Sequence, residues 1–127
     1  MKKHIGKKIL VVDDSSVMRG AVSGILTHHG YHVLVAKDGE EALNIAKENK
    51  QDLKLIITDI HMPNMDGLVF LKQLKATEYG RFVPVIMLTT DSQQDKVDQA
   101  RMSGASAFVV KPFSETQLLN GIQQLIR

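Results

Sequence analysis

The sequence predicts an α/β protein in which helices cover both faces of a five-stranded parallel sheet. Five short apolar runs rich in β-branched residues recur along the chain, and most are continuous, as expected of strands buried on both faces. Stretches with helical spacing separate these runs, and the connecting loops are short. Strict alternation of this kind favours parallel pairing, and five strands are too few to close a barrel. We therefore expect a single (βα)5 doubly wound sheet. The predicted strands are residues 9–12, 33–35, 53–58, 85–89 and 108–110.

Each predicted helix has an apolar face and a signal at one or both ends. The first face includes Val17 and Ala21, and Gly30 is placed to end that helix. The remaining faces run through residues 42–46, 68–74, 97–101 and 118–126. The second helix is expected to open after Asp38 and the third at Asp66; Ser92 with Asp95 and Ser114 with Gln117 have capping-box spacing, and Gly104 is placed to end the fourth helix.

Length and composition limit the possible classes of protein. A chain of 127 residues matches one domain spanning 1–127, and no linker or repeat suggests another. Without cysteine there is no disulfide or zinc–thiolate site, so any metal must be held by oxygen or imidazole ligands. A net charge of +2 gives little support for direct nucleic-acid binding, and we interpret the N-terminal lysines as a solvated tail. No apolar run is long enough to insert into a membrane, so a cytoplasmic location is expected.

Chemically capable side chains follow four of the five predicted strands. In an open parallel sheet the ligand site lies beyond the carboxyl ends of the strands, where the strand order reverses. The second strand, which ends near Ala36 and Lys37, has nothing comparable. Each residue has an ordinary structural explanation alone, such as a helix cap or a turn, but their joint occurrence at one edge favours a functional site. The residues are Asp13 and Asp14 after the first strand, Asp59 at the third, Thr89 and Thr90 at the fourth, and Lys111 at the fifth.

This set of residues suits phosphoryl transfer. Carboxylates about 4 Å apart repel by about 4 kcal/mol at an effective dielectric constant of 20, so either some of them are protonated or a cation lies among them. Mg²⁺ is the natural ion for a site built from oxygen ligands. Asp59 would then be the ionised nucleophile, while Lys111 and the Thr89 hydroxyl would bind oxygens of the incoming phosphoryl group. Such a reaction needs positioning and charge neutralisation more than a general base.

Four segments together resemble the receiver family of response regulators in two-component signalling. They are VVDD at 11–14, TDIHMPNMDG at 58–67, VIMLTT at 85–90 and GASAFVVKPF at 104–113. The resemblance covers essentially the whole chain and is strongest to stand-alone, chemotaxis-type (CheY-like) members. It implies a flavodoxin-like sheet with strand order 2-1-3-4-5, which would bring Asp13 and Asp14 beside Asp59.

The resemblance also implies a role for each site residue. Asp59 corresponds to the phosphoacceptor, and Mg²⁺ would be held by Asp59, directly by Asp14, largely through water by Asp13, and by the backbone carbonyl of His61. Lys111 and Thr89 correspond to the residues that bind the phosphoryl oxygens.

Further implied features concern regulation. A cis peptide is expected at Lys111–Pro112. Phe108 occupies the position of the family's aromatic switch residue, and here it lacks the tyrosine hydroxyl. His61 and Asp91 occupy positions that tune dephosphorylation in the family; whether the His61 side chain crowds or orients the attacking water stays open.

The implied function is that of a response regulator, activated when a histidine kinase or phosphotransfer protein phosphorylates Asp59. The chain would catalyse only its own phosphorylation and dephosphorylation. An output protein, with a flagellar switch component as the leading candidate, would bind the face formed by the fourth helix, the fifth strand and the fifth helix. A phosphorelay shuttle or an adaptor outside chemotaxis is the alternative.

Two other classes fit less well. A phosphohydrolase of the haloacid-dehalogenase type needs Asp-x-Asp after its first strand, whereas here Asp13 and Asp14 are adjacent and Ser15 follows. An FMN carrier would need a phosphate-binding loop there, where two carboxylates repel phosphate. A metal site at His28, His29 and His32 is also disfavoured, because no carboxylate lies near them in sequence.

Overall fold

The computed structural model describes residues 7–62, 64–90 and 94–126, in which strands and helices alternate from end to end. Every predicted strand and helix is present, each within a few residues of its predicted bounds. The elements are β1 (Lys8–Val12), α1 (Ser16–His28), β2 (His32–Ala36), α2 (Gly39–Glu48), β3 (Leu53–Asp59), α3 (Gly67–Lys75), β4 (Val85–Thr89), α4 (Gln94–Met102), β5 (Ala107–Val110) and α5 (Glu115–Leu125).

The five strands form one parallel sheet in the order β2-β1-β3-β4-β5, which confirms the predicted fold class and strand order. The order reverses between β1 and β3, because the chain first adds β2 on one side of β1 and then β3 on the other. The register pairs Val12 with Thr58, so β1 and β3 end side by side. A site at their carboxyl ends is therefore built from residues 13, 14 and 59.

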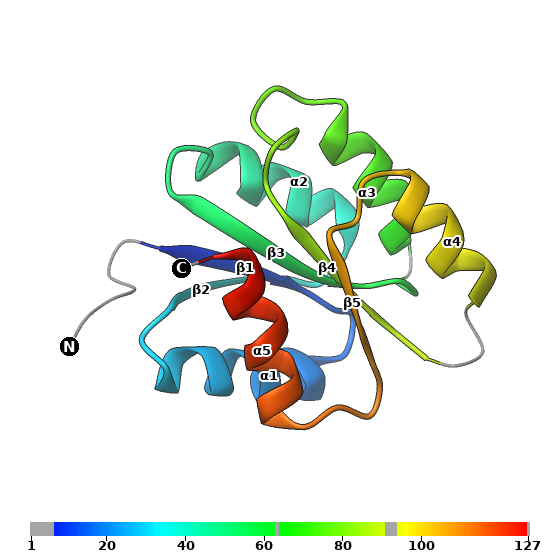
Figure 1. Ribbon diagram of the computed structural model, residues 1–127. Coiled ribbons are helices and arrows are strands. Elements are labelled where there is room, and N and C mark those ends of the chain that lie inside the picture. Colours follow the sequence, from blue (N-terminus) through cyan, green and yellow to red (C-terminus); the bar gives the residue numbers. More distant parts are fainter. Residues whose placement is uncertain (1–6, 63, 91–93, 127) are drawn as a thin grey trace.

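Helices cover both faces of the sheet, α1 and α5 on one and α2, α3 and α4 on the other (Figure 1). Period-two alternation divides the strand residues between two cores. In β1, Leu10 and Val12 face the α2–α3–α4 side, whereas Ile9 and Val11 face the α1–α5 side. Because both faces are covered, the central strands β1, β3 and β4 are almost wholly buried.

The sequence overestimates burial at the sheet edges and on the first helix. Edge strands have a neighbour on one side only, and Val35 of β2 and Val110 of β5 are exposed. The predicted apolar face of α1 was too wide: Val17 is 81% exposed and Ala21 is also exposed. The helix instead packs through Val22 and Leu26, with partly buried neighbours beside them.

The predicted helix starts are confirmed where the structure describes them. Asp38, Asp66 and Ser114 are the N-caps of α2, α3 and α5, and Ser114 forms a complete capping box with Gln117. At α1 the N-cap is Ser15, whose hydroxyl accepts a hydrogen bond from the Met18 amide, so the aspartates before it are not needed as caps. Ser92 lies outside the described residues. Among the helices in those residues, none is both long and apolar enough to cross a membrane.

Candidate functional site

Three carboxylates meet where β1 and β3 end. Asp13 and Asp14 follow β1, and Asp59 is the last residue of β3. One oxygen from each of the three lies within 4.8 Å of the others. The convergence follows from the strand order, because adjacent parallel strands deliver their carboxyl ends to one edge. Asp13 and Asp59 are buried, whereas Asp14 is exposed, so the cluster opens to solvent on one side.

Lys111 brings a positive charge to this cluster from the end of β5. Its Nζ donates a hydrogen bond to Asp59 Oδ2 at 2.8 Å and lies 4.0 Å from Asp13 Oδ2. The Lys111 amide also donates to the carbonyl oxygen of Thr89 at 2.6 Å, and this bond holds the start of the loop against the end of β4. The Lys111–Pro112 bond is cis, as predicted. Strands β3 and β5 are thus linked through side chains across β4.

Asp13 is a buried carboxylate of the cluster, and only one of its two oxygens accepts a hydrogen bond from the described residues. Its Oδ1 accepts a hydrogen bond from the Ser15 amide at 2.9 Å, but its buried Oδ2 has no hydrogen-bond partner among the residues that the structure describes. Burial raises the pKa of Asp13 above its usual value; the Ser15 bond opposes this, the charge of Asp59 adds to it, and Lys111 partly offsets it. A buried carboxylate oxygen that accepts no hydrogen bond from the residues described and lies near the charge of Asp59 favours binding of a cation.

The donor set fits a hard divalent cation. Three carboxylates at one open edge offer only oxygen ligands, and one buried oxygen among them, Asp13 Oδ2, accepts no hydrogen bond from the described residues. Mg²⁺ prefers oxygen ligands and commonly binds through one or two carboxylates while keeping several waters. The exposed side at Asp14 leaves room for such waters. These residues could therefore hold the ion predicted from the sequence.

Thr89 and Phe108 share one face of the sheet beside this cluster. The register pairs Thr89 with Val110 and Met87 with Phe108, so period two places the Thr89 and Phe108 side chains on the same side. The Thr89 hydroxyl donates to the Thr90 carbonyl at 3.2 Å. The Phe108 ring is partly buried against the α2–α3–α4 core, and the Arg101 guanidinium lies 5.2 Å from its centroid.

Of the two residues expected to tune dephosphorylation, His61 and Asp91, only His61 is among the described residues. The His61 side chain is exposed, and its backbone amide donates to Asp59 Oδ1 at 3.4 Å, a long hydrogen bond. His61 therefore borders the nucleophile predicted from the sequence. Asp91 lies outside the described residues. Of the histidines near the end of α1, His29 lies with its Nε2 3.4 Å from Glu115 Oε2, a carboxylate that is distant in sequence.

Sequence reasoning missed three residues that position the site. Arg19 donates from Nη1 to the Asp13 carbonyl at 2.6 Å and so fixes the loop after β1. The Thr58 hydroxyl donates to the Asp59 carbonyl at 3.0 Å. A Cβ on Gly67 would lie 2.1 Å from that same carbonyl oxygen, so only glycine permits α3 to begin this close to β3. No local pattern marks Arg19, whereas Thr58 and Gly67 are the first and last residues of the motif at 58–67, which was the available signal for both.

The comparisons with known proteins agree with this geometry. A family model described as "Response regulator receiver domain" matches residues 9–123. The chain belongs to this family. As a receiver domain, it is a phosphorylation-activated response regulator of a two-component system, and its family is one of signalling proteins.

Relatives of the receiver include proteins named for chemotaxis. A "Chemotaxis protein CheY homolog" of Campylobacter jejuni is 38% identical over 94% of this chain and 92% of its own length. The structure of the chemotaxis response regulator CheY4 of Vibrio cholerae superposes with a TM-score of 0.87 at 38% identity, covering 94% of this chain and 98% of that one. The receiver domain of the sensor histidine kinase PA1611 of Pseudomonas aeruginosa, described with a magnesium ion in its active-site cleft, has a TM-score of 0.86 at 30% identity, covering 95% and 98%.

Proposed function

We propose that Asp59 accepts a phosphoryl group from a phosphohistidine of a histidine kinase or phosphotransfer protein. The observation that carries this proposal is the short contact between Asp59 Oδ2 and Lys111 Nζ beside two further carboxylates. An Asp59 oxygen forms the new bond to phosphorus while the P–N bond of the donor breaks, and the imidazole leaves with the electron pair. Lys111 already lies where it can neutralise charge on a transferred phosphoryl group.

Mg²⁺ is the proposed cofactor, held by Asp13, Asp14 and Asp59 with the backbone carbonyl of His61. When bound, the ion supplies positive charge that screens the carboxylates from each other and from the phosphoryl oxygens. Asp13 Oδ2, which is buried and accepts no hydrogen bond from the described residues, supports this assignment, and so does the magnesium ion described for the PA1611 receiver domain. Thr89 is proposed to donate its hydroxyl to another phosphoryl oxygen.

Labelling with a small donor tests the assignment. Wild type incubated with acetyl phosphate and Mg²⁺ should gain one acid-labile phosphoryl group by intact-mass spectrometry, whereas Asp59→Asn should gain none. Asp52→Asn is the matched control, because Asp52 pairs with Lys8 away from the carboxylate cluster and its removal should leave labelling intact. Full labelling of Asp59→Asn would refute the assignment.

Signalling is proposed to run from Asp59 through Thr89 and Phe108 to the α4–β5–α5 face. Thr89 and Phe108 share a face of the sheet, so movement of Thr89 toward a phosphoryl group opens space that the Phe108 ring can enter. Burying a phenyl ring contributes about 2 kcal/mol, enough to shift a pre-existing equilibrium. A groove of about 360 Å³ along β5 and α5, lined by residues that include Phe108, Val110 and Gln124, supports an output partner on this face.

A flagellar switch component is the proposed output partner, because several relatives are named chemotaxis proteins. We also propose that the protein acts in the cytoplasm. A phosphorelay shuttle or adaptor is the alternative, favoured by the similarity to the PA1611 receiver, which belongs to a sensor kinase. Acetyl-phosphate-treated chain should bind a purified switch component more tightly than Asp59→Asn does. Equal binding by the two would favour the alternative.

A further inference from the structure

Phe82 lies almost wholly in solvent on the segment between α3 and β4. Its side chain is 87% exposed, whereas the five other aromatic residues of the chain are buried or partly buried. Burying a phenylalanine side chain typically contributes about 1.5–3 kcal/mol, and at this position the fold gains little of it. A single exposed apolar residue needs no explanation by itself. The structure around Phe82 supplies two further observations.

The segment that carries Phe82 is firmly held. Lys75 donates from Nζ to the carbonyl oxygens on both sides of Phe82, at 3.3 Å to Arg81 and 2.5 Å to Val83. The Thr77 hydroxyl accepts from the Gly80 amide at 2.9 Å, and the Thr77 carbonyl accepts from the Arg81 amide at 3.1 Å. The exposed ring is thus presented from a defined backbone. Preorganisation of this kind lowers the entropic cost of binding.

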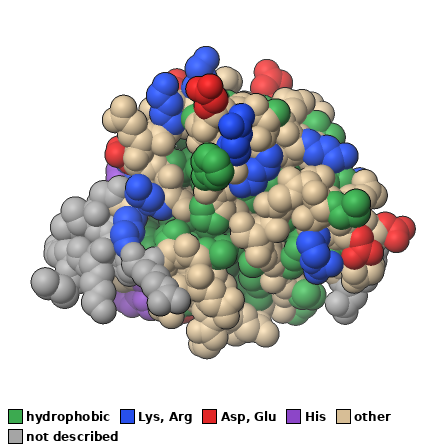
Figure 2. All heavy atoms as spheres, turned by 45° about the horizontal axis from the view of Figure 1, so that its top comes forward, with side chains coloured by type: hydrophobic (Ala, Val, Ile, Leu, Met, Phe, Trp, Pro, Cys, Tyr) green, Lys and Arg blue, Asp and Glu red, His purple; other side chains and the backbone are tan. Residues whose placement is uncertain are grey.

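The second observation is a small pocket beside this segment, with unpaired positive charge around it. Lys50, Gln51, Glu78 and Tyr79 line a cavity of about 350 Å³, large enough for an apolar side chain of a partner. Lys and Arg side chains border hydrophobic surface on this side of the molecule (Figure 2). In the part of the chain that the structure describes, Lys50 makes no ion pair, and neither does Arg81.

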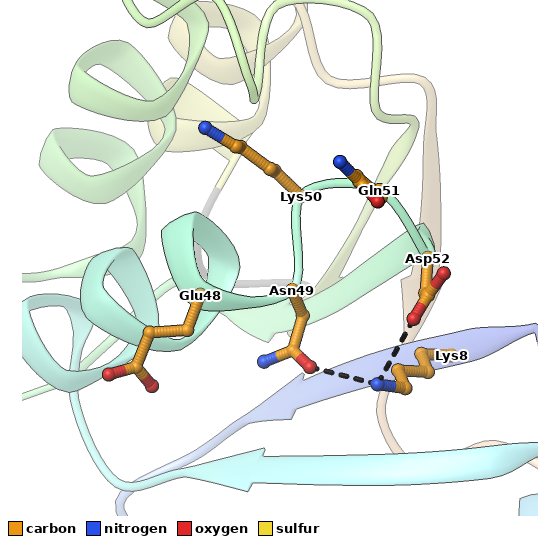
Figure 3. Close-up of a pocket in the computed structure, with 6 residues that line it drawn as sticks. All are labelled: Lys8, Glu48, Asn49, Lys50, Gln51 and Asp52. Atoms are coloured by element: carbon orange, nitrogen blue, oxygen red, sulfur yellow. Dashed lines mark hydrogen bonds and ion pairs between the residues drawn. The ribbon is translucent and has the colours of Figure 1, made fainter.

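The turn between α2 and β3 explains why Lys50 is available. Lys8 donates to Asn49 Oδ1 at 3.0 Å and pairs with Asp52 at 3.3 Å, so its charge is already compensated. Figure 3 shows Lys50 and Gln51 pointing away from these contacts. The acidic residue of the turn, Asp52, is therefore occupied by Lys8. Lys50 therefore has no ion pair with Asp52, and its side chain lines the neighbouring pocket.

We propose that Lys50, Gln51, Tyr79, Arg81 and Phe82 form a docking surface, the basic–aromatic patch, for an acidic protein segment that carries an apolar side chain. The apolar side chain would enter the pocket and contact Phe82, while carboxylates pair with Arg81 and Lys50. Aromatic and arginine side chains typically dominate binding energy at such interfaces. A protein segment suits the patch better than nucleic acid, because the acidic side chain of Glu78 lines the pocket beside Lys50 and would repel phosphate.

The patch lies at the amino-terminal ends of the strands, whereas Asp59 lies at their carboxyl ends. It is built by the loops that precede β3 and β4, whereas Asp59 ends β3. A strand of this length spans roughly 20 Å at about 3.3 Å per residue. Occupancy of the patch therefore leaves the phosphorylation site and the α4–β5–α5 face open. The inference is that this partner binds whether or not Asp59 is phosphorylated.

Nuclear magnetic resonance on the full ¹⁵N-labelled chain tests this with defined probes. Three synthetic peptides of equal length are compared: one alternating Glu with Leu and Phe, one with Lys replacing Glu, and one with Ser replacing the apolar residues. Only the first should shift the amide signals of residues 50–51 and 78–83. Phe82→Ala and Arg81→Glu should each weaken binding by at least about tenfold. Asp59→Asn should bind as wild type does.

Met102→Ala is the matched control, because Met102 is 90% exposed on α4 and its loss should leave peptide affinity unchanged. Phe82 is exposed, so Phe82→Ala is expected to fold, which its amide spectrum checks directly. Equal binding of the Lys peptide, or binding by none of the three, would overturn the proposal. A single-stranded oligothymidylate that shifts the same signals more strongly than the acidic peptide would replace it with nucleic-acid binding.

Discussion

Replacing Asp13 by asparagine tests whether the carboxylate cluster is strained without a cation. Asparagine keeps an oxygen that can accept from the Ser15 amide and removes the charge from the buried Oδ2, which accepts no hydrogen bond from the described residues. The opposing charge interactions are of similar size: at an effective dielectric constant of 20, repulsion from Asp59, which lies within 4.8 Å, is at least about 3.5 kcal/mol, and attraction to Lys111 at 4.0 Å is about 4 kcal/mol. What remains is chiefly the cost of burying the Asp13 charge.

In EDTA at neutral pH, Asp13→Asn should therefore be more stable than wild type by about 1 kcal/mol, which is about 4 °C in Tm for a domain of this size. With Mg²⁺ the order should reverse. At a concentration about 100 times the Kd, the ion stabilises the folded wild type by about 2.7 kcal/mol, and the variant should gain less. Thermal unfolding with and without Mg²⁺ measures both differences.

The pH dependence of this stability difference checks whether burial of the Asp13 charge is its cause. Burial raises the folded-state pKa of Asp13 above the unfolded value, so the protonated form favours folding below the unfolded pKa. Wild type loses that contribution as pH rises through the folded pKa, and asparagine does not titrate. The advantage of the variant in EDTA should thus grow from about pH 4 upward. An advantage that does not change with pH, or a less stable variant in EDTA, would refute the reasoning.

Three other substitutions probe separate parts of the structure. Gly67→Ala should lower the free energy of unfolding by about 3 kcal/mol, because its Cβ would collide with the Asp59 carbonyl; urea unfolding measures this, and a change within error would contradict it. Ser114→Ala should cost about 1 kcal/mol by removing a capping box, with unchanged phosphorylation as its control. Phe108→Ala should still be phosphorylated but bind the output partner roughly 30-fold more weakly, whereas Phe108→Tyr should be tolerated; normal binding by phosphorylated Phe108→Ala would exclude this residue from the switch.

The strand ends were predictable from sequence because topology alone places them. Once β1 and β3 are known to be parallel neighbours, Asp13, Asp14 and Asp59 must converge, whatever the details of packing. Lys111 could likewise be assigned to the same edge, since it follows β5. Apolar runs and caps predicted the order of the elements along the chain, whereas the resemblance to the receiver family supplied the strand order that makes β1 and β3 neighbours.

Contacts that depend on the path of a single side chain or loop could not be predicted in this way. The Arg19 bond to the Asp13 carbonyl joins residues six apart, a spacing with no periodic meaning. Val17 matches the helical spacing of α1, yet the sheet meets a narrower stripe of that helix, so Val17 stays exposed. Phe82 is one apolar residue in a loop, and the Lys75 bonds that hold the backbone on both sides of it join residues that no periodic pattern connects.

The link between Lys111 and Asp59 explains why a change on β3 should be felt at β5 and not at the basic–aromatic patch. Asp59 Oδ2 and Lys111 Nζ lie 2.8 Å apart, so a phosphoryl group on Asp59, as proposed, would contact the Lys111 ammonium. Lys111 directly follows Val110, the last residue of β5, and its amide is bonded to the Thr89 carbonyl, so its displacement acts on the ends of β4 and β5 together. Phe82 precedes the other end of β4, where Lys75 holds the loop through bonds that do not involve the carboxylate cluster. The fully buried strand β4 separates the two ends. Phosphorylation should therefore change affinity at the α4–β5–α5 face while leaving peptide affinity at Phe82 unaltered, and measuring both affinities on one phosphorylated sample would separate a local response from a change of the whole fold.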